Sequence, residues 1–149
     1  MKSLVEVIQD PVVRPRVVED ACRLIDEEVD RKGGVGGFAL KQGYKLVRKL
    51  KGGRMIPDAV NHLLDEFAGA IEPLHAEHRE AGGQGFDAFL RQHEDRAANA
   101  LLAITDRRAE RSDNRVLVAT YRKLRPSAIG HVREALPGVG RMVDRYTAD

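Results

Sequence analysis

Apolar residues recur every three to four positions along most of the chain, which is the spacing of one face of an α-helix. The clearest example lies in residues 57–82, where Val60, Leu63, Leu64, Phe67, Ile71 and Leu74 form one stripe. This stripe predicts a long central helix, with a kink or restart between Gly69 and Pro73, because a proline inside a helix removes a backbone hydrogen bond. Similar spacing predicts further helices over residues 4–9, 15–31, 38–50, 86–111, 116–124, 126–136 and 137–146.

One short segment could be taken for a strand. Residues 116–119 are Val-Leu-Val-Ala, a composition found in strands, but no second segment could pair with them. Tyr121 and Leu124 continue a helical spacing from there, so we expect a helix. The pattern therefore predicts an all-α fold: a bundle of seven to eight helices with no sheet. Because 149 residues are too few for two ordinary domains, we expect a single helical domain over residues 1–149.

The composition refines this expectation. Aromatic residues make up 5% of the chain and tryptophan is absent, so the core must consist mainly of Leu, Val, Ile and Ala. Cys22 is the single cysteine and cannot form an internal disulfide, which is typical of a reducing compartment. No apolar run approaches the length of a signal peptide or a membrane span. We therefore expect a cytoplasmic protein, and no residue pattern calls for a cofactor.

Charge is distributed in blocks of alternating sign. The net charge is −4 over residues 1–30, +8 over 31–54, −7 over 55–106 and +5 over 107–149. Two interpretations follow. Consecutive helices could neutralise one another through ion pairs, or the block at residues 31–54 could leave a basic face free for an anionic partner.

The basic block supplies the candidate partner-binding residues. They are Lys32, Lys41, Lys45, Arg48, Lys49 and Arg54. Four of them, at positions 41, 45, 48 and 49, fall on one face of the predicted helix and could contact phosphates of nucleic acid or an anionic membrane. Two observations oppose these partners: no recognised nucleic-acid motif or interleaved aromatic residue is present, and Phe38, Tyr44 and Leu50 are expected in the core.

Glycines at positions 33, 34, 36 and 37 precede this helix. Residues 34–39 formally match the dinucleotide-binding fingerprint that ends in alanine. That fingerprint requires a strand before it, whereas a helix is predicted here. We interpret the glycines as a connection between two helices. The alternative is an anion site at the N-terminus of the second helix, with Lys32 and Lys41 nearby.

A metal site is the third candidate. Glu72, His75 and His78 have the spacing i, i+3, i+6, and Glu-x-x-His is half of the ligand set of ferritin-like di-iron bundles. No second copy of the motif occurs, and Pro73 interrupts this one. Serines lie at expected caps and turns, and paired carboxylates lie on polar faces. The sequence therefore carries no enzyme signature.

Four segments together resemble a small bacterial family of helical domains of unknown function. They are residues 10–15 (DPVVRP), 63–67 (LLDEF), 102–109 (LAITDRRA) and 121–128 (YRKLRPSA). The resemblance covers nearly the whole chain and implies a bacterial single-domain protein. It implies no activity, cofactor or catalytic residue.

Three functional hypotheses result, in order of preference. The first is a non-enzymatic helical interaction or scaffold protein, dimerising through an apolar helix face, whose basic face contacts an acidic protein or another polyanion. The second is peripheral binding to nucleic acid or an anionic membrane through residues 41–54. The third is a metal-dependent enzyme that uses Glu72, His75 and His78.

Overall fold

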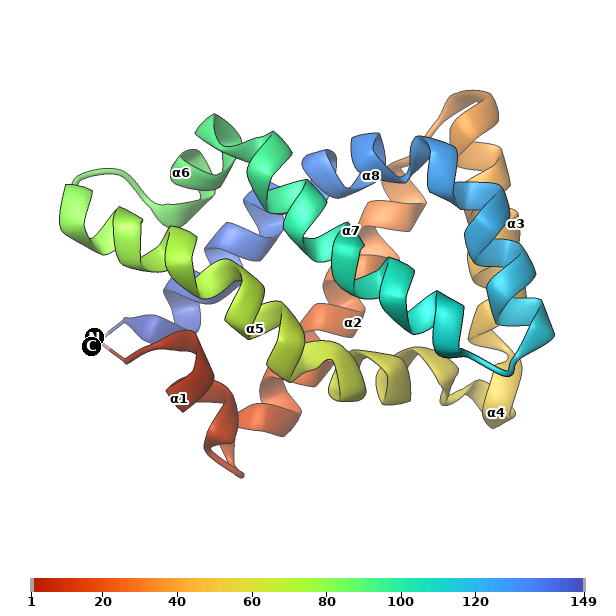
Figure 1. Cartoon of the computed structure of the whole chain (residues 1–149), viewed down its shortest axis with the longest axis horizontal. Helices are drawn as coiled ribbons and strands as arrows, with labels where there is room; N and C mark the ends of the chain where they lie inside the picture. Colours follow the sequence, from red (N-terminus) through yellow and green to blue (C-terminus); the bar gives the residue numbers. More distant parts are fainter. Residues whose placement is uncertain (1, 149) are drawn as a thin grey trace.

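Helices make up nearly all of the computed structural model, which describes residues 2–148. Over that range it contains eight helices and no strand: α1 (Leu4–Gln9), α2 (Val13–Arg31), α3 (Gly34–Arg48), α4 (Leu50–Gly53), α5 (Met55–Ala81), α6 (Phe86–Gln92), α7 (Glu94–Arg111) and α8 (Arg115–Thr147) (Figure 1). The expectation of an all-α bundle of seven to eight helices is confirmed.

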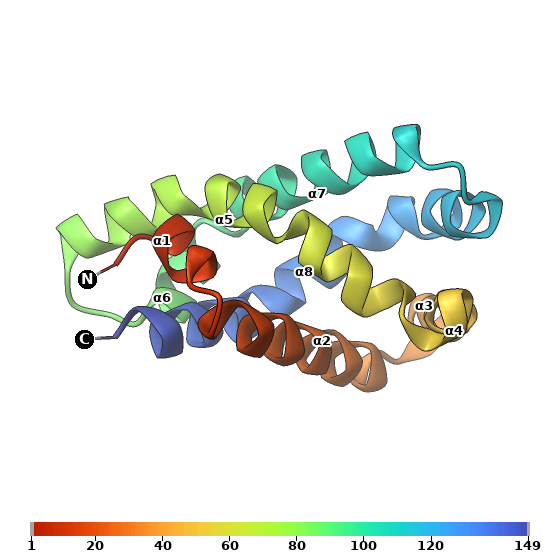
Figure 2. The ribbon, with the colours of Figure 1, turned by 90° about the horizontal axis from the view of Figure 1, so that it is seen from below.

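The helices form an elongated bundle. In Figure 2, α7 and most of α5 run along one side, while α2 and the last part of α8 run along the other. Both ends of the chain lie at one end of the bundle, and α3 and α4 lie at the opposite end. Four apolar side chains are almost fully buried where α5, α6 and α8 meet: Leu74, Phe86, Leu90 and Leu136. The centre of the core is rich in leucine, as the composition indicates.

A side-chain cap starts α1, and an Asp10 turn leads into α2. Ser3 accepts a 3.2 Å hydrogen bond from the Glu6 backbone N–H, which is half of a capping box and confirms the predicted start of α1. Asp10 accepts from the Val12 backbone N–H at 2.9 Å. Helix α2 then starts at Val13, two residues before the predicted start, and Pro15 falls in its first turn, where a missing N–H breaks no hydrogen bond.

Helix α5 runs through Pro73 as one helix, so of the kink or restart expected from the sequence, the restart is wrong. Pro73 and Gly69 both lie on the exposed side of the helix. The Gly69 carbonyl that loses its partner can therefore bind water, and tertiary contacts on the buried side hold the helix together.

The predicted helix over residues 86–111 is wrong in one respect, because it is divided into α6 and α7. His93 leaves the helical region (φ −119°, ψ 33°), and its backbone N–H donates to the carbonyls of Phe89 and Leu90. The change of direction allows Phe86 and Leu90 to be buried completely. Sequence spacing did not reveal the break, since the helical period continues on both sides.

The three helices predicted between residues 116 and 146 form one helix, α8. Pro126 and Pro137 lie inside it, and Figure 1 shows α8 changing direction along its length. Proline bends a helix without necessarily ending it, provided that neighbouring contacts hold the two parts. Residues 116–119 are helical, as predicted.

The core contains a cavity of about 220 Å³ between α1, α2, α5 and α8, with Leu101 of α7 at one side. The cavity is only partly enclosed, and its lining is almost wholly apolar.

Candidate functional site

Helix α3 lies across one end of the bundle (Figures 1 and 2). It begins at Gly34, so the glycines that we expected to form a connection make up its first turn. Two contacts fix its inner side. The Tyr44 hydroxyl donates to Asp26 of α2, and a Cβ at Gly43 would lie 2.8 Å from Thr120 Cγ2 of α8, too close for any larger residue without movement. The opposite side of α3 faces solvent.

The exposed side of α3 carries unpaired cations. Lys41, Lys45, Arg48 and Lys49 are exposed, and none of them forms an ion pair within residues 2–148. Arg54, after α4, is also exposed and forms no ion pair within residues 2–148. The interpretation that the acidic helices neutralise this face is therefore wrong.

The acidic helices pair with other cations instead. Acidic side chains of α5 contact arginines of α2 and α7, those of α7 contact arginines of α8, and Asp20 of α2 contacts Arg145. These partners lie along the length of the bundle, whereas α3 lies at its end. Which charges form ion pairs depends on which helices are neighbours in the fold. The order of charge blocks along the chain does not reveal this.

The same side of α3 exposes three large apolar side chains. Val35 is 90% exposed, Phe38 66% and Leu46 52%. The expectation that Phe38 faces the core is wrong. The sequence contained evidence that Phe38 is exposed. Leu40 belongs to the buried stripe, and residues two apart on a helix do not share a face. Val35 and Leu46 are eleven residues apart, which is three helical turns, and so share a face.

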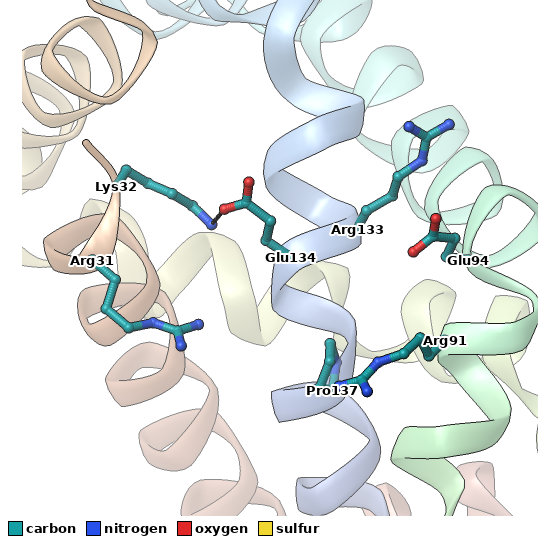
Figure 3. Close-up of a pocket in the computed structure, with 7 residues that line it drawn as sticks. All are labelled: Arg31, Lys32, Arg91, Glu94, Arg133, Glu134 and Pro137. Atoms are coloured by element: carbon teal, nitrogen blue, oxygen red, sulfur yellow. Dashed lines mark hydrogen bonds and ion pairs between the residues drawn. The ribbon is translucent and has the colours of Figure 1, made fainter. Parts of the chain in front are cut away.

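Lys32 does not belong to this exposed face. Its side chain is 6% exposed, and its ammonium group lies 3.2 Å from a Glu28 carboxylate oxygen and 2.5 Å from one of Glu134. Figure 3 shows Lys32 reaching from the end of α2 to Glu134 on α8. The ammonium group holds the pKa of Glu134 below its usual range. Lys32 therefore joins two helices, and we remove it from the candidate partner-binding residues.

A cleft of about 540 Å³ surrounds that pair (Figure 3). Arg31 pairs with Glu28, and Arg133 pairs with Asp95. Among the charged groups that line the cleft, Arg91 and Glu94 alone form no ion pair with a described residue. Their charges are opposite, so the cleft favours neither an anion nor a cation.

The proposed metal ligands do not converge. Glu72 accepts a 2.9 Å hydrogen bond from the Leu4 backbone N–H, and His78 contacts the Gln84 carbonyl oxygen at 2.5 Å. His75 is buried against Phe86, with its ring centre 6.2 Å from that of His78. Within residues 2–148, no three His, Cys, Asp or Glu side chains are placed to hold a metal ion. The arrangement contradicts the metal-site hypothesis for Glu72, His75 and His78.

His75 belongs instead to an aromatic cluster between α5 and α6. Its ring lies edge-on to Phe86, with 5.1 Å between the ring centres, and His78 lies 5.3 Å from the same phenylalanine. His75 is 1% exposed, and neither ring nitrogen has a hydrogen-bond partner among the described atoms. Burial, helped by the nearby Arg79, lowers the pKa of His75 below its usual value, so the ring stays neutral.

The four segments that carry the family resemblance contact one another through polar side chains. Arg14 of the first segment donates to both carboxylate oxygens of Asp65 in the second, at 3.1 and 3.2 Å. Glu66 of the second segment accepts a 2.8 Å hydrogen bond from Arg108 of the third. The segments thus connect α2 to α5 and α5 to α7.

The third and fourth segments complete this chain of contacts. Arg125 donates to both oxygens of Asp106 at 2.9 and 3.2 Å, and the Tyr121 hydroxyl donates to Asp106 at 2.5 Å. These donors hold the pKa of Asp106 below its usual range, while burial and the carboxylate raise the pKa of Tyr121 to about 12. The shared segments therefore join α2, α5, α7 and α8, a structural role that sequence reasoning missed.

Fold and surface together define a class of protein: a single all-helical bundle that presents a basic and apolar helix at one end. The chain belongs to the family of unknown function DUF6918, whose model matches residues 4–147. No curated protein and no solved structure matches the chain. No helix within residues 2–148 is long and apolar enough to cross a membrane.

Proposed function

We propose that this protein is a non-enzymatic helical binding protein that attaches to an anionic membrane surface through α3. The residues involved form what we call the α3 surface: Val35, Phe38, Lys41, Lys45, Leu46, Arg48 and Lys49. The observation that carries the proposal is the exposure of three large apolar side chains beside four unpaired cations on one side of a helix.

Electrostatic attraction supplies the first part of the binding. Residues 31–57 contain no Asp or Glu, so no acidic side chain of this segment opposes the cations of α3. Each Lys or Arg near an anionic leaflet contributes about 1 kcal/mol at moderate ionic strength. Lys41, Lys45, Arg48 and Lys49 together are therefore enough for measurable attachment, and Arg54 adds a further exposed cation nearby.

Apolar contact supplies the second part. Helices that lie in the membrane interface place Phe, Leu or Val among the lipid chains, with Lys and Arg at the level of the headgroups. Val35, Phe38 and Leu46 are available for this because none of them packs in the core. Helix α3 lies across the end of the bundle, beside the first part of α8 (Figures 1 and 2), and the side that carries these residues is exposed.

A second copy of the chain is a poor occupant of the same surface. A two-fold dimer through α3 would bring Lys45 and its neighbours close to their own copies, and like charges across an interface repel. The homodimer expected from the sequence thus gains no support from this face. An acidic protein, the partner first expected from the sequence, remains the alternative because it offers complementary charge.

A cytoplasmic location and a bacterial origin belong to this proposal as well. The lone cysteine and the family resemblance support them, and the inner leaflet of a cell membrane carries the anionic lipids that α3 would contact.

Vesicle co-sedimentation tests the proposal. We expect the protein to sediment with mixed phosphatidylcholine–phosphatidylglycerol vesicles, to ignore pure phosphatidylcholine vesicles, and to dissociate as salt is raised. The triple variant K41E/K45E/K49E should lose binding, and Phe38→Ser should weaken it.

The matched control is R16E/R91E/R141E, which changes the net charge equally at exposed arginines outside α3 that have no ion pair in the described range. It should retain binding. Equal loss in the control would contradict the proposal, because net charge alone would then account for attachment. Binding to polyglutamate but not to vesicles would reassign α3 to an acidic protein, and binding to an oligonucleotide alone would reassign it to nucleic acid.

A further inference from the structure

The cavity in the core is remote from the α3 surface and has a uniform lining. Its walls come from α1, α2, α5 and α8, and every side chain that lines it is apolar except Tyr146 and Thr147. Both hydroxyls are already engaged: the Tyr146 hydroxyl donates to Asp20, and Thr147 Oγ1 donates to the Val143 carbonyl at 2.8 Å. The cavity therefore presents no free polar group to an occupant.

Water is an unsuitable occupant for this reason. A buried water molecule needs two to four hydrogen-bond partners, and genuinely apolar cavities in proteins stay dry. Side chains that face an unfilled space lose dispersion contacts with neighbouring atoms. An apolar molecule in the cavity would restore the lost contacts without needing a hydrogen bond.

We propose that this cavity binds the hydrocarbon chain of a small amphiphile. A cavity of about 150 Å³ accommodates benzene, with six carbons, so 220 Å³ corresponds to about nine carbons. The lining on α5 extends over twelve residues, from Val60 through Leu64 to Ile71, or about 16 Å along the helix axis. Such an elongated lining fits a linear alkyl chain better than a compact ring, and the polar end of the molecule stays in solvent.

Helix α1 is the wall that can open for the ligand. Leu4, Val7 and Ile8 of α1 line the cavity, yet the helix has only six residues and cannot be stable without its packing. Two hydrogen bonds hold its ends, a long-range one from the Leu4 backbone N–H to Glu72 and a local one from Arg14 to the Ile8 carbonyl. The other walls are parts of long helices that also carry the core.

Binding of 1-alkanols, measured by calorimetry on the full chain, tests the proposal. Each added methylene should tighten binding about fourfold while the chain still lies in the cavity. The gain should stop at about nine carbons, where the cavity is full. In parallel, 1-nonanol should raise the melting temperature followed by circular dichroism, because it binds only the folded state. With 1,9-nonanediol the affinity should fall, since one hydroxyl would be buried without a partner.

Filling the cavity from its wall provides the second arm. Ala68 lines the cavity from α5, and Ala68→Leu should raise the melting temperature and weaken 1-nonanol binding at least about tenfold. Ala21→Leu, from α2, gives the same test if the first variant does not fold. The control Ala119→Leu, on the exposed side of α8, should leave binding unchanged.

Two results would overturn the proposal. One is that the wild-type protein binds no alkanol and the cavity-filling variants melt at lower temperature. The lining side chains would then already fill the cavity. The other is equal affinity for the alcohol and the diol. Substitutions in α3 that abolish vesicle binding should leave alkanol binding intact, so the two proposals can fail separately.

Discussion

The hydroxyl of Tyr121 on α8 and the carboxylate of Asp106 on α7 are joined by a 2.5 Å hydrogen bond. Arg125 holds the same carboxylate from the next turn of α8. The pair lies within two of the segments shared with the family, so those segments serve to dock α8 onto α7. This contact is the basis of the first prediction.

Tyr121→Phe removes the hydrogen bond to Asp106 and the 2.6 Å hydrogen bond with the Thr105 hydroxyl. At about 1 kcal/mol for each bond, it should lower the free energy of unfolding by about 2 kcal/mol, measured by urea denaturation. Because the folded state lowers the pKa of Asp106, its contribution is present above the ordinary value of 3.8 and is lost as pH falls through the lower folded value. The pH dependence of Tyr121 has the opposite sign: its contribution to stability is present below pH 10 and is lost as pH rises through about 12.

The control for Tyr121→Phe is Arg122→Ala, at an exposed position in the same helix. Thr120→Ala is not suitable as a control because Thr120 packs on α3. Equal stability of Tyr121→Phe and Arg122→Ala would contradict the docking role.

Buried His75 should make the protein less stable in mild acid. Its folded-state pKa lies below the ordinary 6.5, so the unfolded chain binds more protons as pH falls below that value, and stability falls with it. Above about pH 7 the group has no such effect. His75→Leu should flatten the decline between about pH 7 and about pH 5 in urea denaturation series. Ala119→Leu, at an exposed position with no titratable group, should retain the wild-type pH dependence. An unchanged slope in His75→Leu would show that another group titrates.

Two lysines that the sequence placed together should behave differently. Lys32→Ala leaves Glu28 buried with only Arg31 for a partner and should cost about 3 kcal/mol of stability, the lower end for breaking a buried pair. Lys41→Ala changes an exposed, unpaired residue and should stay within about 0.5 kcal/mol of wild type. Chemical denaturation of both variants measures the difference. A similar small effect in both would mean that Lys32 is solvated.

The packing of α6 on α8 depends on the absence of a side chain at Gly140. A Cβ there would lie 2.4 Å from the Cα of Asp87 and 2.5 Å from its backbone nitrogen, a contact that only backbone movement could relieve. Gly140→Ala should therefore destabilise the protein by about 2 kcal/mol or more. In the same helix, a Cβ at Gly130 meets nothing within 4 Å. Gly130→Ala should be neutral or stabilising by up to about 1 kcal/mol, because alanine favours the helix. Thermal unfolding of the pair checks the contrast.

The candidate surface was only partly predictable. The basic side of α3 followed from Lys41, Lys45, Arg48 and Lys49, since their spacing alone places them together. The exposure of Phe38 was not predicted. Its apolar side chain indicated a core position, although its place in the helix is on the face opposite the buried stripe. Lys32 belongs to the same block in sequence, but it is buried and paired with Glu134, more than a hundred residues away.

The sequence by itself determined which segments are helical, where caps such as Ser3 start them, and how charge is divided along the chain. These properties depend on residues within a few positions of one another. The tertiary structure alone decided that His93 breaks a helix and that Pro126 and Pro137 do not. It also decided that acidic side chains form ion pairs along the bundle, while the exposed cations of α3 form none within residues 2–148. It also left an apolar cavity in the core. Each of these outcomes depends on contacts between distant helices, whose free energy exceeds local preference and which no short stretch of sequence contains.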